Sequence, residues 1–121
     1  TSEWFKMTDA HPFFDHVGDH ADELETSVMM HYHPELVSLS EAGQGDSRGF
    51  GIKALSEGKV WIPRNWAKVS RDTGIGSPAK ATAEKGARFA AAVVEKYVEF
   101  LADFARVETI DDLYEPQFHN E

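Results

Sequence analysis

Two histidines and a run of carboxylates lie between positions 15 and 25 of the chain. The histidines are His16 and His20, and the carboxylates are Asp15, Asp19, Asp22, Glu23 and Glu25. A neutral imidazole beside carboxylates can accept a proton and return it, as general acid–base catalysis requires. This segment is therefore the strongest candidate for chemistry in the chain. The alternative is a purely structural role, in which the carboxylates only cap a helix and His20 lies on the surface.

The same segment has the residue pattern of a helix N-terminus. Asp19 is a favourable N-cap residue, and Asp22 three positions later resembles the second member of a capping box. In this register His20 is the first residue inside the helix. The positive end of the helix dipole there disfavours the imidazolium, so we expect a neutral ring at pH 7. The helix is predicted to run from about residue 19 to 31 and to end before Pro34.

Further along, a strand is predicted over residues 58–63, at a sheet edge because it ends in a proline. Ser77 and Pro78 suit the N-cap and first position of a long helix expected over residues 79–106. Gly86 interrupts the apolar stripe of this helix at a cost of about 1 kcal/mol relative to alanine. Close packing against another backbone is one reason for a glycine at that position.

Composition limits the function classes. The chain has 121 residues, 41% of them hydrophobic, which allows one domain or part of one. A net charge of −9 argues against a nucleic-acid partner or an acidic membrane surface. The absence of cysteine excludes thiol chemistry and fits a cytoplasmic protein. No apolar run approaches the ~20 residues that span a bilayer.

The predicted elements make an incomplete domain. Two helices, one or two short strands and long loops do not enclose a core by themselves. Parallel strands that are buried on both faces read as continuous runs of valine, isoleucine and leucine, and no such run is present. If the protein is α/β, most of its sheet must therefore come from elsewhere.

Two ordered blocks resemble the creatininase (creatinine amidohydrolase) family. Residues 18–30 and then 33–37 are similar to the family's His-Ala/Gly-Gly-x-x-Glu-Thr-Ser-x-Met block and the x-Pro-x-Leu-Val that follows it. Asp22 stands where glycine is common, a departure at the floor of the pocket. Residues 74–86 resemble the block Gly-x-x-Ser/Pro-x-Lys-Ala-Thr-x-Glu-Lys-Gly. The resemblance divides the chain into residues 1–107, the C-terminal half of a creatininase-like domain, and an acidic tail at 108–121.

The resemblance implies a fold and an activity. Its fold class is α/β, a three-layer arrangement with a mainly parallel sheet and a long C-terminal helix, often assembled as a homo-oligomer of six copies. Its members hydrolyse C–N bonds of small or cyclic amides with divalent metals such as Zn²⁺ and Mn²⁺. The family's metal-binding Glu-x-His…Asp and Asn-Gly-His-x-Glu-like blocks are not found in these 121 residues. The metals and the N-terminal half of the enzyme are therefore expected from outside this chain.

The resemblance also assigns roles to residues. His20 corresponds to the acid–base histidine, and Asp19 to an acidic position that contacts substrate or orients the ring. Glu25 matches the glutamate of the Glu-Thr-Ser block, where a catalytic role and a structural one at the helix start are both open. Gly18 and His16 are expected to line the substrate site. A tryptophan of creatininase falls near His16, which weakens the case for creatinine itself as substrate.

Three alternatives remain open from the sequence. The chain could bind metal on its own through His16, His20, Asp19 and Glu23. It could be an N-terminal-threonine hydrolase with Thr1 as nucleophile. It could also be a non-catalytic scaffold or interaction subunit that keeps the fold without the chemistry.

Overall fold

Two α-helices dominate the computed structural model, which describes residues 3–115. Residues 1–2 and 116–121 lie outside this range. The nucleophile predicted at Thr1 and the last part of the predicted tail therefore lie outside the described residues. The longer elements are α1 (Glu23–Tyr32) and α4 (Ala83–Phe104). The short helices are η1 (Trp4–Lys6), η2 (Pro34–Leu36), η3 (Leu39–Glu41), α2 (Lys53–Ser56), α3 (Trp66–Val69) and η4 (Ile110–Leu113).

The predicted α/β fold with a mainly parallel sheet is wrong for the described residues. Between residues 3 and 115 the extended pairings are the isolated antiparallel bridges His20–Ile75 and Ser47–Ser70, and no sheet forms. The strand predicted over 58–63 is also absent, because Gly58 turns the chain with a φ of +71° and Pro63 offers no N–H. A ladder needs paired strands, and this part of the chain supplies none.

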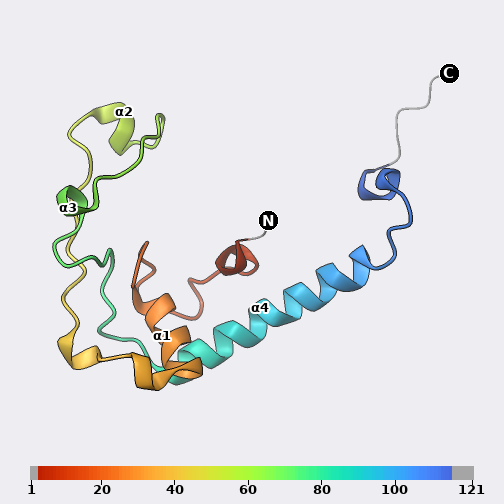
Figure 1. Ribbon diagram of the computed structural model, residues 1–121, viewed down its shortest axis with the longest axis horizontal. Coiled ribbons are helices and arrows are strands. Elements are labelled where there is room, and N and C mark those ends of the chain that lie inside the picture. Colours follow the sequence, from red (N-terminus) through yellow and green to blue (C-terminus); the bar gives the residue numbers. More distant parts are fainter. Residues whose placement is uncertain (1–2, 116–121) are drawn as a thin grey trace.

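The core lies where α1 crosses the first half of α4 (Figure 1). Phe89 of α4 is fully buried there, and Phe13 and Phe14 meet its ring edge-on with centroids 5.5 and 5.3 Å away. Trp4 of η1 approaches the same ring at 6.1 Å. The other buried apolar members of this cluster are Ala10, Leu24 and Val93. The N-terminal segment and α1 are therefore organised around one phenylalanine of α4.

The start of α1 differs from its prediction by several residues. Asp22, not Asp19, is the N-cap, and its carboxylate accepts from the backbone N–H of Glu25 at 3.0 Å. Ala21 has a φ of +48°, a left-handed conformation that interrupts a helix before it can include His20. His20 instead exchanges backbone hydrogen bonds with Ile75, so the helix-dipole argument for a neutral ring does not hold. The predicted end before Pro34 is confirmed, since α1 stops at Tyr32.

α4 begins four residues later than its predicted start. Thr82 is the N-cap, and its hydroxyl accepts from the N–H of Lys85 at 3.2 Å. The backbone N–H of Thr82 donates to the buried hydroxyl of Ser27 at 3.1 Å, which fastens the start of α4 to α1. Ser77 accepts only a local bond from Ala79 at 3.3 Å. The start of α4 is therefore set by the contact of Thr82 with α1 and not by the favourable capping sequence Ser77-Pro78.

Gly86 lies directly against the backbone of α1. A Cβ at this position would be 2.0 Å from the carbonyl oxygen of Ser27. We therefore expect Gly86→Ala to destabilise the chain by about 2 kcal/mol through overpacking, although alanine is the better helix former. Urea unfolding measures the change. Gly51→Ala is the control, since nothing lies within 4 Å of its added carbon. A midpoint that stays the same or rises for Gly86→Ala would contradict close packing.

Candidate active site

His20 lies in the turn that precedes α1, and its ring is half exposed. Its backbone N–H donates to the carbonyl of Ile75 at 3.1 Å, and its carbonyl accepts from Ile75 N–H at 2.8 Å. Glu25, in the first turn of α1, accepts from the N–H of Ala21 at 2.6 Å. The same carboxylate oxygen lies 3.7 Å from His20 Nδ1. Glu25 thus supports the left-handed turn at Ala21 and faces the imidazole at once.

A second group of side chains meets His20 from the other side. Trp66 of α3 presents its ring edge-on to the imidazole, with centroids 5.3 Å apart. The Arg64 guanidinium lies 4.7 Å from the centroid of the Trp66 ring and donates to the carboxylate of Asp19. Trp66 Nε1 donates to the carbonyl of Thr73 at 3.0 Å, which fixes the indole. The turn that carries His20 is therefore tied to residues 64–73.

Arg64 and Trp66 were not among the residues selected from the sequence. They are 45 and 46 positions from the residues they contact, Asp19 and His20. An arginine in a loop and a tryptophan at the start of the short helix α3 carry no periodic signal. They lie beside His20 because the bridge between His20 and Ile75 holds the segment that follows Arg64 and Trp66 against the turn before α1.

Gly18 and His16 occupy different parts of this region. A Cβ on Gly18 would lie 2.5 Å from the carbonyl oxygen of Ile75, so the glycine permits the backbones to approach. The N–H of His16 donates to the carboxylate of Glu23 at 2.8 Å. Among residues 3–115, no hydrogen bond or ring contact joins His16 to His20. A substrate-binding role for Gly18 and His16 stays a prediction.

Glu23 is a fully buried carboxylate behind the site. It accepts from the N–H groups of Asp15 and His16 at 3.2 and 2.8 Å and from Lys85 Nζ at 2.5 Å. Lys85 also donates to the carboxylate of Asp15 at 2.7 Å. This cluster, Asp15, Glu23 and Lys85, joins the segment before the site to both long helices.

The cluster has shifted pKa values. Burial raises the pKa of Glu23, but hydrogen bonds from Lys85 and the amides of His16 and Asp15 outweigh it and lower the pKa overall. The hydrogen bond from Lys85, with the charges of Lys80 and Lys85, lowers the pKa of Asp15. Hydrogen bonds to Asp15 and Glu23 raise the pKa of Lys85. All three shifts favour the charged cluster at neutral pH.

These shifts predict acid sensitivity. Because the folded pKa values of Asp15 and Glu23 lie below the ordinary 3.8 and 4.5, their stabilisation is present above these values and lost as pH falls below about 4. Lys85, with a pKa raised above 10.5, loses its contribution only at strongly alkaline pH. Urea midpoints measured from about pH 7 down to about pH 3 should fall. A Glu23→Gln variant, already destabilised, should show a smaller fall; an equal fall would exclude Glu23 as a source.

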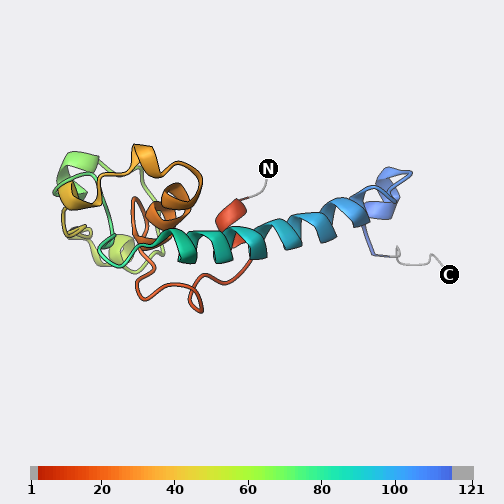
Figure 2. The ribbon, with the colours of Figure 1, turned by 90° about the horizontal axis from the view of Figure 1, so that it is seen from below.

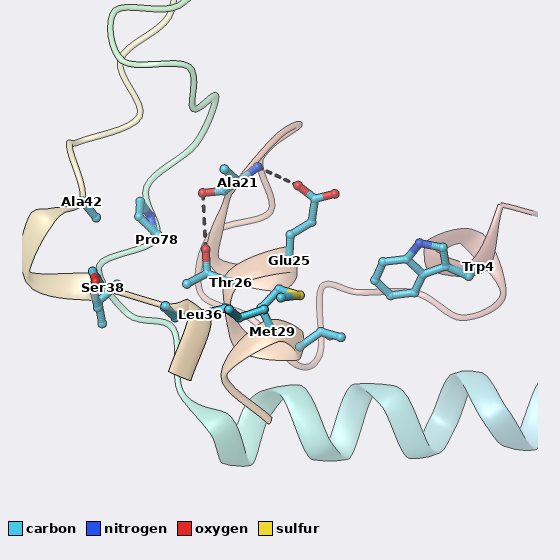
Figure 3. A pocket seen from close by; sticks show the side chains of 12 residues that line it. Trp4, Ala21, Glu25, Thr26, Met29, Leu36, Ser38, Ala42 and Pro78 are labelled. Carbon is cyan, nitrogen blue, oxygen red and sulfur yellow. Dashed lines mark hydrogen bonds between the residues drawn. The ribbon is translucent and has the colours of Figure 1, made fainter. Parts of the chain in front are cut away.

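An apolar pocket of about 520 Å³ adjoins Glu25 (Figure 3). Figure 3 shows the Glu25 carboxylate directed toward Ala21, with Met29 and Leu36 below it and Trp4 on the far side. The remaining lining residues are Ala21, Thr26, Val28, Val37, Ser38, Leu39, Ala42 and Pro78. The pocket combines apolar walls with a single carboxylate, which suits a small uncharged or cationic molecule.

The described residues do not fit a metal centre. Between residues 3 and 115, no three His, Asp or Glu side chains lie close enough together to hold an ion. Glu23 is occupied by Lys85 and two amides, and Asp19 by Arg64. The alternative of a metal site built from His16, His20, Asp19 and Glu23 is therefore wrong for this part of the chain. A pair such as His20 and Glu25 falls short of the three protein ligands of a catalytic zinc.

In the turn before α1 the His20 imidazole faces the Glu25 carboxylate, and the apolar pocket adjoins Glu25. An imidazole beside a carboxylate is a pair that can exchange protons. The comparisons with known proteins define the class more closely. The chain belongs to the creatininase family, because the family described as creatinine amidohydrolase matches residues 2–101. The resemblance of the two sequence blocks is thereby confirmed.

A solved structure shares the fold. It is the crystal structure of a protein from Bacteroides fragilis named "Putative creatinine amidohydrolase", with 47% sequence identity and a TM-score of 0.85. The match covers 94% of this chain and 44% of that one, so the chain spans less than half the length of its structural relative. No curated protein matches the chain.

Within residues 3–115, none of the helices is long and apolar enough to cross a membrane.

Proposed function

We propose that this chain supplies His20 as the general acid–base residue of an amidohydrolase that cleaves the C–N bond of a small or cyclic amide. The observation that carries the proposal is the position of His20 in a member of the creatininase family, between the Glu25 carboxylate and the Trp66 ring. The apolar pocket beside Glu25 is large enough to receive the non-reacting part of such a substrate.

In the proposed reaction a water oxygen bonds to the amide carbon, and the C–N bond then breaks. His20 gives its proton to the departing nitrogen and regains one from the attacking water. Glu25 faces Nδ1 at 3.7 Å, so the other ring nitrogen is left for the substrate. This distance exceeds a hydrogen bond and is expected to shorten when substrate binds. Asp19, held by Arg64, orients the substrate or the ring.

The rest of the proposed enzyme lies outside residues 1–107. Since the described residues lack a ligand set, we assign the divalent metals, Zn²⁺ or Mn²⁺, to the N-terminal half of the enzyme. Residues 108–121 form a tail in this division, and the assembled enzyme is expected to be a homo-oligomer such as a hexamer.

The test compares this chain alone, an N-terminal half from a family member, and the two coexpressed. Creatinine and a set of formylated and cyclic amides serve as substrates. Turnover is expected only in the coexpressed sample. A complex that turns over none of these amides would contradict the proposal and favour the non-catalytic subunit.

Metal removal gives a separate prediction. Dialysis of the assembled enzyme against EDTA is expected to abolish amide hydrolysis. The urea midpoint of the 121-residue chain alone should not change, because its described residues offer no group of three ligands. A fall in that midpoint on chelation would show that this chain holds a structural metal itself.

A further inference from the structure

α4 carries apolar side chains over more of its circumference than α1 covers. Phe89, Ala90 and Val93 in its first half are buried against the α1 core. In its second half, Val94, Val98 and Leu101 are 53, 60 and 56% exposed. Phe100 and Phe104 are also exposed, and their rings stack on each other with centroids 5.8 Å apart. These five exposed residues are called the distal face below.

The distal face extends into solvent. In Figure 2 the second half of α4 runs away from the other helices, with η4 beyond its end. A single helix in water gains most of its stability from packing of an apolar face. Tyr97 in this half of α4 packs against the core, but the five residues of the distal face stay at least half exposed within the described chain. A contiguous apolar patch of this kind marks an interface.

We propose that the distal face binds the remaining part of a creatininase-family enzyme. This inference rests on the proposed function, which requires that part, and it identifies the surface that holds it. Length supports this occupant: the match covers 44% of the Bacteroides fragilis protein, so more than half of that protein lies outside the part equivalent to this chain. That additional polypeptide is available to pack against the distal face, which the described residues of this chain leave exposed.

Charge distinguishes this occupant from a second copy of the chain. Each copy has a net charge of −9, so two copies meeting at this face would repel one another. Glu95, Glu99 and Asp103 lie on α4 beside the distal face, and Lys96 pairs with Glu99 and Arg106 with Asp103, so the border carries both charges. The fitting partner surface is therefore apolar in its centre and polar at its edge.

The probe is the part of the Bacteroides fragilis protein outside the matched region, tagged and coexpressed with this chain. Wild type is expected to copurify with it as a one-to-one complex in sedimentation velocity. Val98→Lys and Leu101→Lys should each weaken the complex by about 100-fold or more, because a charge is buried against apolar surface. Glu41→Lys is the matched control, since it introduces the same residue at an exposed position of η3, outside α4, and its affinity should stay within about threefold.

Two results would overturn the assignment of the surface. One is retention of the complex by both lysine variants at the distal face. The other is self-association of this chain that excludes the probe and is lost in Val98→Lys, which would make the occupant a second copy. The proposed function is tested separately, because a His20→Ala chain should still bind the probe. A complex that depends on Val98 but hydrolyses no amide leaves the surface assignment standing and removes the activity.

Discussion

Replacement of His20 by alanine is expected to lower the turnover of the assembled enzyme by about 10²–10⁴-fold, the usual contribution of a general acid–base residue. The imidazole faces Glu25 on one side and Trp66 on the other, and no other histidine among residues 3–115 makes a ring or ion-pair contact with these two. A proton for the departing amide nitrogen would then have to come from bulk water. Steady-state kinetics on the assembled enzyme measure the effect.

His31→Ala is the control for this experiment. His31 is exposed in the last turn of α1, where its ring packs against Tyr32. Its removal should leave turnover nearly unchanged, since it lies at the opposite end of the helix from the site. If the His20→Ala enzyme keeps its turnover within about tenfold of wild type, His20 does not have the acid–base role.

Loss of the Glu23 carboxylate should strongly destabilise the chain. Glu23→Ala would leave Lys85 and the amides of Asp15 and His16 without their buried acceptor. Breaking a buried ion pair by removing one partner costs about 3 kcal/mol or more. We expect this loss in the free energy of unfolding of the 121-residue chain, measured by urea titration.

Glu95→Ala is the matched control for this change. Glu95 is exposed on α4, so its replacement should alter the free energy of unfolding by no more than about 0.5 kcal/mol. A cost below about 1 kcal/mol for Glu23→Ala would mean that water replaces the lost acceptor and that the cluster does not hold the segment before the site.

Local signals in the sequence were sufficient for some features. Pro34 ended α1 where expected, because the residue before a proline is excluded from helical geometry by its immediate neighbour. Gly86 was expected to permit close packing, and Ser27 is the backbone that it meets. The two family blocks are short contiguous motifs, so they identified the creatininase family without knowledge of the fold.

Other features depended on residues distant in the chain. Asp19 has a good capping side chain, but Arg64 binds it and Asp22 caps α1 instead. α4 starts at Ala83 because Thr82 bonds to Ser27 in another helix. The sheet implied by the family fold is absent from the described residues, since strands require partners that this stretch does not contain.

The sequence by itself therefore determined the family, the helical stretches and the identity of the candidate acid–base histidine. Only the tertiary structure decided that His20 lies outside the helix, that Trp66 and Arg64 stand beside it, and that the distal face of α4 is left open. The reason is physical: caps, turns and motifs act over a few residues, whereas the surroundings of a side chain are made by segments that meet only when the chain folds.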